Sequence, residues 1–272
     1  KNHCITSIFK KGLYLQKNCY YSDMEHHHKL KNGFTLAEVL ITLGVIGVVI
    51  AMTLPTLINQ YKEKVTLHKL ETAYSLLSNA YNAALFDDGT PDTWENKNKN
   101  GLGLAETFAK KINLQNICLT TDLKCHFNTK TTTYTSLNGY DVGSYKTIVG
   151  TVGNMNGMKV IFYFNAPECR GFNQYAWDSV TEKSPYYHAC GTILVDINGN
   201  QKPNRWGVDL FKFILTDSKI VPDGTPPTPY YSLKTSCNPN MTSWDGSVNG
   251  SFCGAWLLTN KNMDYLRKEV KW

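Results

Sequence analysis

The longest apolar stretch of the chain runs from Phe34 to Leu54, 21 residues in which Glu38 is the only ionisable side chain. As a helix, this stretch is about 30 Å long, which matches the hydrocarbon core of a bilayer. It is longer than the apolar core of a cleaved signal peptide, and no small-residue cleavage site follows it. Because Lys29 and Lys31 precede the stretch, we expect a single transmembrane helix with a cytoplasmic N-terminus.

Beyond Pro55 the apolar positions change from a continuous run to a helical stripe. Leucines and tyrosines recur mostly three and four residues apart: Leu57, Tyr61, Leu67, Leu70, Tyr74, Leu77, Tyr81 and Leu85. This period is typical of an amphipathic helix that buries one face. We therefore expect one long helix over residues 34–85, ending before Gly89 and Pro91, with its second half packed against a folded head.

The head, residues 86–272, contains one more helical pattern and four strand patterns. A short amphipathic helix is predicted over residues 102–112. Segments rich in β-branched and aromatic residues lie at 145–153, 157–165, 190–199 and 206–216, and the hairpin signal NMNG joins the first two. Two stretches rich in Asn, Gly, Pro, Ser and Thr, 165–190 and 222–255, are predicted loops. The fold class is α+β: a long N-terminal helix packed on a small antiparallel sheet of about four strands.

Positive charge is concentrated at the start of the chain. Residues 1–33 hold six lysines against Asp23 and Glu25, a charge of +4 out of +6 for the whole chain. The remainder is nearly balanced, so the composition does not predict a nucleic-acid-binding surface. We interpret residues 1–33 as a cytoplasmic leader, with Met24 as an alternative start, and the histidines at 26–28 as part of that leader rather than a metal site.

Six of the eight cysteines follow the leader: Cys118, Cys125, Cys169, Cys190, Cys237 and Cys253. An even number in a translocated domain favours disulfides. Sequential pairing would close loops in regions with few strand signals: Cys118–Cys125, Cys169–Cys190 and Cys237–Cys253. A zinc site is the alternative, but the chain has no CxxC spacing.

Glu38 is costly in a membrane helix, by about 2–3 kcal/mol on insertion scales. It either reaches water at the membrane surface or pairs with a cation from another chain. The stretch from Gly33 to about Leu57, beginning GFTLAEVLITLGVIGVVIAMTLP, resembles the N-terminal signature of type IV prepilins and of pseudopilins from type II secretion and DNA-uptake systems. The shared features are a basic leader, a Gly-Phe pair, a Glu four residues after the Phe, and a Pro that ends the apolar run.

The resemblance implies a set of roles for these residues. A prepilin peptidase would cut between Gly33 and Phe34 on the cytoplasmic side, and Phe34 would then be N-methylated. Glu38 would pair with the Phe34 ammonium of a neighbouring subunit inside the filament, which supplies the missing cation. Pro55, which ends the apolar run and is the second residue assigned to assembly, would leave a kink or a locally loosened turn, because it removes one backbone donor. Further partners would be the bacterial inner membrane and other pilin or pseudopilin subunits, and no nucleic acid is required.

The most distinctive stretch of the head is VDINGNQKPNRWGVDLFKF, residues 195–213. It resembles a D-x-N-G…P-N…G-x-D pattern of pilin-like and pseudopilin heads. Oxygen atoms of Asp196, Asn198 and Asp209 suit a calcium ion, although the position of the last EF-hand ligand is Gly207. The other interpretation is a structural turn, because Asn-Gly is a hairpin signal and Asp196 can cap the turn. No other cofactor is predicted.

No catalytic motif accompanies these features, and we expect a protein without enzymatic activity. The leading hypothesis is a subunit of a type IV pilus-like filament or a type II secretion pseudopilus. A head of this size favours a minor or specialised pilin, by analogy. One alternative is a membrane-anchored binding module that does not polymerise and that recognises a glycan or a protein through loop aromatics: Tyr175, Trp177, Tyr186, Tyr187, Tyr230 and Tyr231. An anchored enzyme ranks last.

Overall fold

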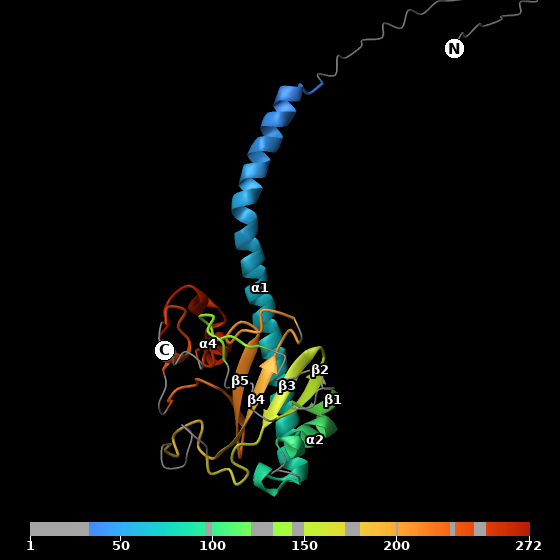
Figure 1. The fold of residues 1–272 in the computed structure, drawn as a ribbon, viewed down its shortest axis with the longest axis vertical. Coiled ribbons are helices and arrows are strands. Elements are labelled where there is room, and N and C mark those ends of the chain that lie inside the picture. The colour runs from blue at the N-terminus through green and yellow to red at the C-terminus, as the bar shows by residue number, and fades with distance from the viewer. Residues whose placement is uncertain are drawn as a thin grey trace, which may run out of the picture. The chain divides into compact units, whose positions relative to one another are not determined.

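The computed structural model describes residues 33–95, 100–120, 133–142, 150–171, 180–199, 201–228, 232–241 and 249–272. The chain divides into two compact units, residues 1–54 and residues 55–272. Helix α1, Leu36–Asp88, continues through Pro55, so its residues 36–54 belong to the first unit and its residues 55–88 to the second (Figure 1). The long helix predicted over residues 34–85 is confirmed to within three residues at each end.

In the second unit, one face of α1 is buried. Its buried residues recur at helical spacing: Leu70, Ala73, Leu77, Ala80, Tyr81 and Ala84. The predicted apolar stripe is correct from Leu67 onward, but it is wrong at its start, because Leu57 and Tyr61 are 60% and 69% exposed. The head does not extend that far along the helix, and Glu63 is the first partly covered residue of α1.

Within the described residues, six strands form one antiparallel sheet in which each strand pairs with its neighbours in sequence. The strands are β1 (Leu114–Leu119), β2 (Thr151–Met155), β3 (Met158–Tyr163), β4 (Ala189–Asp196), β5 (Leu210–Thr216) and β6 (Ile220–Pro222). The predicted hairpin is confirmed: β2 and β3 are joined by Asn156 and Gly157, whose φ angles of 53° and 82° suit a two-residue turn. The edge strands β1 and β6 add to the four strands expected.

Both faces of the central strands are covered, which explains why β3 and β4 are buried along their whole length. Helices α1 and α2 (Leu102–Lys111) contribute to the cluster on one face, where Phe108 and Phe162 have ring centroids 5.3 Å apart. The other face carries a second cluster that includes Ile161 and Trp206. Neighbouring residues of β3 therefore enter different clusters, as strand geometry requires.

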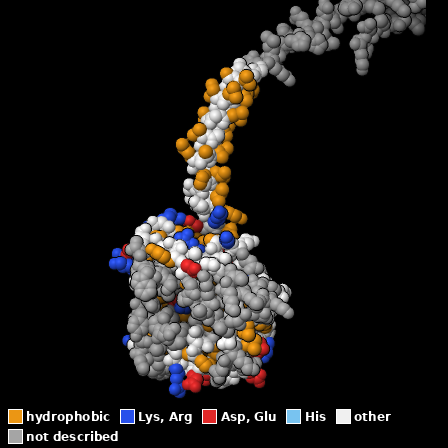
Figure 2. Space-filling view, in the orientation of Figure 1, with side chains coloured by type: hydrophobic (Ala, Val, Ile, Leu, Met, Phe, Trp, Pro, Cys, Tyr) orange, Lys and Arg blue, Asp and Glu red, His pale blue; other side chains and the backbone are white. Residues whose placement is uncertain are grey.

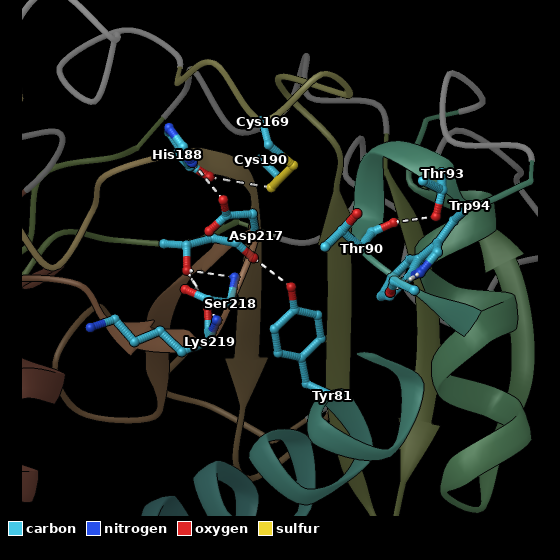
Figure 3. Close-up of a disulfide and its surroundings, with 12 residues drawn as sticks. Tyr81, Thr90, Thr93, Trp94, Cys169, His188, Cys190, Asp217, Ser218 and Lys219 are labelled. Carbon is cyan, nitrogen blue, oxygen red and sulfur yellow. Dashed lines mark hydrogen bonds and ion pairs between the residues drawn. A yellow bond between two sulfur atoms is a disulfide. The ribbon is translucent and has the colours of Figure 1, made fainter. Parts of the chain in front are cut away.

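Aromatic side chains hold α1 along β5. The Tyr81 hydroxyl donates a buried hydrogen bond of 2.5 Å to the Thr216 carbonyl at the end of β5 (Figure 3). About two helical turns earlier in α1, the Tyr74 ring stacks on Phe213, with ring centroids 5.5 Å apart. These contacts fix the position of the helix along the strand as well as its distance from the sheet.

The remaining described segments are tied by disulfides and short helices. Among the described residues the disulfides are Cys169–Cys190 (Figure 3) and Cys237–Cys253, two of the pairs that sequential pairing predicts. Cys118 is disulfide-bonded as well, and its expected partner Cys125 lies outside the described residues. The prediction of an uninterrupted loop over 222–255 is wrong, because it contains helix α3 and the start of α4. The short helices are η1 (Pro91–Thr93), α3 (Leu233–Ser236), α4 (Cys253–Asn260) and η6 (Asp264–Leu266).

Candidate functional site

The first candidate site is the start of α1, where Glu38 bonds to Thr35. The Glu38 Oε2 atom accepts hydrogen bonds from the Thr35 backbone N–H at 2.8 Å and from the Thr35 hydroxyl at 2.9 Å. In return, the Glu38 backbone N–H donates to the Thr35 hydroxyl oxygen at 3.2 Å. This reciprocal arrangement is a capping box, with Thr35 at the N-cap and Glu38 as the third helical residue.

The role of Thr35 was missed by the sequence analysis, which considered only the charge of Glu38. The signal was present, because the letters TLAE fit the capping-box pattern of Thr followed by Glu three residues later. The structure therefore gives the carboxylate a partner within its own chain. Phe34, directly before Thr35, is 87% exposed and is not involved in the cap.

The apolar half of α1 is exposed along its whole length. Every residue from Leu36 to Leu54 is exposed, and hydrophobic side chains cover this half of the helix in Figure 2. Among the described residues, α1 is the one helix long and apolar enough to cross a membrane, and none of its most apolar window is buried. An exposed apolar surface of this extent needs lipid or an apolar protein partner.

The second candidate site is the loop between β4 and β5, where the three predicted residues come together. Asp209 accepts hydrogen bonds from the Asn198 side-chain amide at 3.0 Å and from the backbone N–H groups of Asn204 and Arg205 at 2.7 and 2.5 Å. Asp196 accepts from the backbone N–H of Asn198 at 3.2 Å. The two carboxylates therefore hold the loop in shape, as expected for a structural turn.

Asp196 is fully buried, and its environment disfavours the ionised form. Burial, followed by the nearby negative charge of Asp209, raises the pKa of Asp196 to about 7. The hydroxyl of Tyr134 donates to its Oδ2 atom at 2.9 Å, which acts in the opposite direction. Lys159, which faces Asp196 across β3 and β4, also lowers this pKa. Burial raises the pKa of Asp209 too, against the hydrogen bonds that it accepts.

The loop also contains oxygen atoms without partners. The side-chain Oδ1 atoms of Asn198 and Asn204 are buried and have no hydrogen-bond partner among the described residues. Together with the carboxylates of Asp196 and Asp209, they offer the oxygen donors that a hard cation prefers. No group of three or more His, Cys, Asp or Glu side chains suited to a metal occurs in the described part of the chain. The residues present therefore fit calcium only with amide oxygens as additional ligands.

The aromatic loop surface expected for a binding module is contradicted at one position. Tyr186 is fully buried, and its hydroxyl accepts a hydrogen bond from the Gly224 N–H at 2.9 Å. Tyr187 is partly exposed and stacks on His188 with ring centroids 4.1 Å apart. The other four aromatic residues lie outside the described residues. Tyr186 is part of the hydrophobic core, and the loop-like composition of its segment does not predict this burial.

Comparison with known protein families matches two parts of the chain. Residues 56–266 match a family of unknown function, DUF6613. The chain belongs to the DUF6613 family. Residues 28–54 match the prokaryotic N-terminal methylation motif. No curated protein and no solved structure matches.

The two matches meet at the boundary between the two compact units. The methylation motif contains Gly33, Phe34 and Glu38 and most of the exposed apolar helix. Followed by that helix and an α+β head with disulfides, it makes the chain a type IV pilin-like protein, consistent with a membrane-anchored precursor. The DUF6613 match covers the head and the second half of α1.

Proposed function

We propose that this chain is the precursor of a filament subunit, in a type IV pilus-like filament or a type II secretion pseudopilus. The observation that carries the proposal is the methylation motif on the exposed apolar residues 36–54 of α1. Such a helix is stable in a bilayer as a precursor and in an apolar filament core after assembly. The size of the head favours a minor or specialised subunit over a major one.

The proposed maturation begins at the start of α1. Prepilin peptidase cleaves between Gly33 and Phe34 on the cytoplasmic side, and Phe34 is then N-methylated. Glu38 exchanges its capping contacts with Thr35 for the Phe34 ammonium of a neighbouring subunit. The exchange becomes favourable when the site is desolvated, because a buried carboxylate needs a cation. Subunits that are out of axial register would leave this charge unpaired. Pro55 marks the end of the apolar run, and α1 continues through it.

Two measurements test this proposal. Mass spectrometry of the mature chain is expected to find a methylated Phe34 at its N-terminus, and an intact junction at Gly33 would contradict processing. Glu38→Ala is expected to abolish incorporation into filaments while membrane insertion and disulfide formation in the head continue. Glu95→Ala, at an exposed position of the head, is the control variant. Normal assembly of Glu38→Ala would contradict the assembly role of Glu38, whereas a wild-type chain that never enters filaments would favour the membrane-anchored binding module.

We also propose that the loop between β4 and β5 binds calcium. Support comes from the buried, unpartnered Oδ1 atoms of Asn198 and Asn204, two residues that bond to the Asp209 carboxylate through the Asn198 amide nitrogen and the Asn204 backbone N–H. When bound, calcium would neutralise these two carboxylates and supply partners for the amide oxygens. The melting temperature of the full-length chain in detergent is expected to rise when chelator is replaced by Ca²⁺. Equal melting temperatures would leave the loop with its structural role alone.

A further inference from the structure

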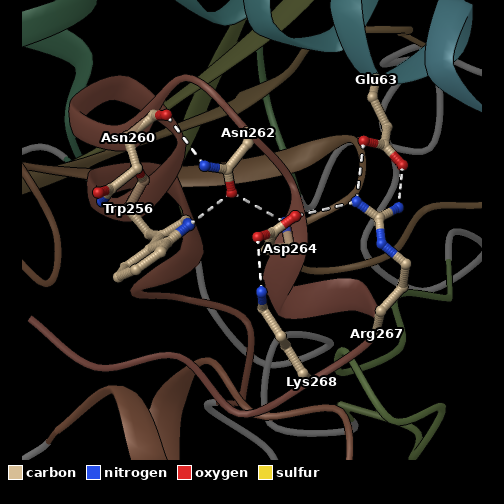
Figure 4. A network of polar contacts seen from close by, with 7 residues as sticks. All are labelled: Glu63, Trp256, Asn260, Asn262, Asp264, Arg267 and Lys268. Carbon is tan, nitrogen blue, oxygen red and sulfur yellow. Dashed lines mark hydrogen bonds and ion pairs between the residues drawn. The ribbon is translucent and has the colours of Figure 1, made fainter.

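The segments that meet at the first covered turns of α1, residues 57–71 and 261–272, carry an excess of positive charge. Glu63 is the first partly covered residue of α1, and its carboxylate pairs with the guanidinium of Arg267 (Figure 4). The C-terminal segment, residues 261–272, therefore lies beside the first turns of α1 that the head covers. Because Glu63 follows Leu54 by nine residues, this contact is at most about 14 Å along the helix from the end of the apolar run.

The acidic groups in this region are occupied by basic partners. Asp264 accepts a hydrogen bond from Arg267 at 3.2 Å and pairs with Lys268 at 2.9 Å (Figure 4). Glu71 pairs with Lys261 at 2.7 Å. These ion pairs neutralise the acidic groups, but other lysines in the same region have no acidic partner among the described residues. Residues 57–71 and 261–272 together hold seven basic and four acidic side chains, a formal charge of +3. All the rest of the chain after the leader is therefore slightly acidic.

Three exposed lysines on α1 have no ion-pair partner among the described residues: Lys62, Lys64 and Lys69. Lys271 is 82% exposed, and its one ion-pair contact within the described part of the chain is long, 3.9 Å to Glu269. In Figure 2, Lys and Arg side chains are visible on the head beside the helix, and others lie at the left and lower edges of the head. We call Lys62, Lys64, Lys271 and Trp272 the basic collar.

Aromatic side chains accompany these lysines. Trp272 is 49% exposed and packs on Trp256, with ring centroids 5.6 Å apart. Tyr61, predicted to face the head, is instead 69% exposed and directly precedes Lys62. Tryptophan, tyrosine and lysine together are the side chains that concentrate at a membrane surface, where an apolar body and a polar or charged end are both satisfied.

We propose that the basic collar binds the anionic headgroups of the membrane from which α1 emerges. The headgroup layer extends roughly 5–7 Å beyond the hydrocarbon core. Lys62 and Lys64 follow Leu54 by eight and ten residues, at most about 12 and 15 Å along the helix, and their long side chains can reach back toward that layer. The attraction is electrostatic and decays over about 8 Å at physiological salt, so only the charges of this end contribute.

Binding of the collar would hold the head against the membrane before any assembly step. It requires a membrane-embedded precursor, and it does not require a filament. The chemistry recognised is a fluid surface of phosphate groups, because Lys62 and Lys64 are two residues apart on α1 and therefore project from nearly opposite sides of the helix. The competing occupant is a second copy of the chain, and the experiment below separates the two.

The test uses the full-length chain in vesicles, with amine labelling of individual lysines read by mass spectrometry. In vesicles with about 30% phosphatidylglycerol, labelling of Lys62, Lys64 and Lys271 is expected to fall about threefold relative to pure phosphatidylcholine, and high salt should restore it. Lys183 and Lys219 are exposed internal controls. Lys219 lies next to the end of β5, where Thr216 accepts the hydrogen bond from Tyr81. Tyr81 is eighteen residues beyond Glu63 on α1, so Lys219 is far from the basic collar along the helix.

A matched pair of variants sharpens the result. The double variant Lys62→Glu and Lys64→Glu is expected to remove the lipid dependence of labelling at Lys271, whereas Lys183→Glu with Lys219→Glu should keep it. Equal labelling of the collar in both lipid compositions would overturn the proposal. Protection that follows the protein-to-lipid ratio rather than the lipid charge would also overturn it, in favour of a second copy. Glu38→Ala is expected to leave these results unchanged, so failure here and failure of filament assembly are distinguishable.

Discussion

Glu38 and Thr35 satisfy each other at the start of α1, through two hydrogen bonds to the carboxylate and one to the hydroxyl oxygen. The carboxylate of Glu38, which is costly to insert into a membrane, therefore lies where it stabilises the N-terminus of α1. A carboxylate near a helix N-terminus is also favoured by the helix dipole. The isolated chain thus has a resting arrangement for the same side chain that a filament would pair with a neighbour.

Thr35→Val should loosen the first turn of α1. The substitution keeps the shape of the side chain but removes the hydroxyl, and loss of an N-cap costs about 1 kcal/mol, or roughly fivefold in local opening. Hydrogen exchange of the amide of Glu38 in the full-length chain in micelles measures this change. Thr53→Val is the matched control, since its hydroxyl bonds only to the Val49 carbonyl in the preceding turn. Unchanged exchange at Glu38 would mean that the capping box is not formed in solution.

The burial of Asp196 predicts a pH dependence of stability. Its pKa is about 7 in the folded chain, against an ordinary value of 3.8, so the folded state holds the proton more tightly than the unfolded state. The free energy of unfolding should therefore fall as the pH rises from about 4 to about 7 and should then level off.

Asp196→Asn should remove this component and stabilise the chain at pH 8, by up to a few kcal/mol. The measurement is the difference in melting temperature between the variant and the wild type across pH, with chelator present. Asp264→Asn is a control of opposite sign: hydrogen bonds to Lys268 and Arg267 lower the pKa of Asp264, so its stabilising contribution is lost at acidic pH. A pH-independent difference between Asp196→Asn and wild type would contradict the assignment.

Local sequence patterns predict the parts of this fold whose signals are long or strong. The apolar run, the hairpin at Asn156-Gly157 and the proximity of Asp196 to Asp209 across a short connection all belong to this class. The edge strands were missed for physical reasons. Strand β1 is mostly exposed and has an irregular register between Gln115 and Cys118, and β6 is three residues long. Neither strand has the alternation of apolar and polar residues by which a strand is predicted from sequence.

Burial set by distant contacts was equally out of reach. Tyr186 lies in a segment with loop composition, yet it is covered by Val221, which is 35 residues away in sequence. In the same way, Leu57 and Tyr61 continue the helical stripe perfectly well, but no part of the described head extends over them. A periodic pattern shows which face of a helix is apolar, and tertiary structure decides how much of that face is covered.

The disulfide between Cys237 and Cys253 should contribute strongly to the stability of the C-terminal part of the head. Closing a separation of 16 residues stabilises a chain by about 3 kcal/mol in the loop-entropy description. Replacing both cysteines by serine should lower the denaturant midpoint of the full-length chain correspondingly, measured without reductant. The effect should be larger on the fluorescence of the tryptophans near α4 than on far-ultraviolet circular dichroism of α1. Wild-type midpoints in the double variant would show that packing alone holds α3 to α4.

The final prediction concerns the contact that positions α1 on the sheet. Tyr81→Phe removes the hydroxyl that bonds the Thr216 carbonyl at 2.5 Å in a buried site, and it should destabilise the chain by about 1–3 kcal/mol because the carbonyl loses a partner. Tyr74→Phe removes a longer, partly buried bond of 3.3 Å to the Ile220 carbonyl and should cost about 0.5 kcal/mol. Both variants keep their rings and hence their stacking on Phe108 and Phe213. Chemical denaturation of the full-length chain in detergent compares them directly, and equal losses for the two would show that burial of the Tyr81 hydroxyl is not what fixes the helix on β5.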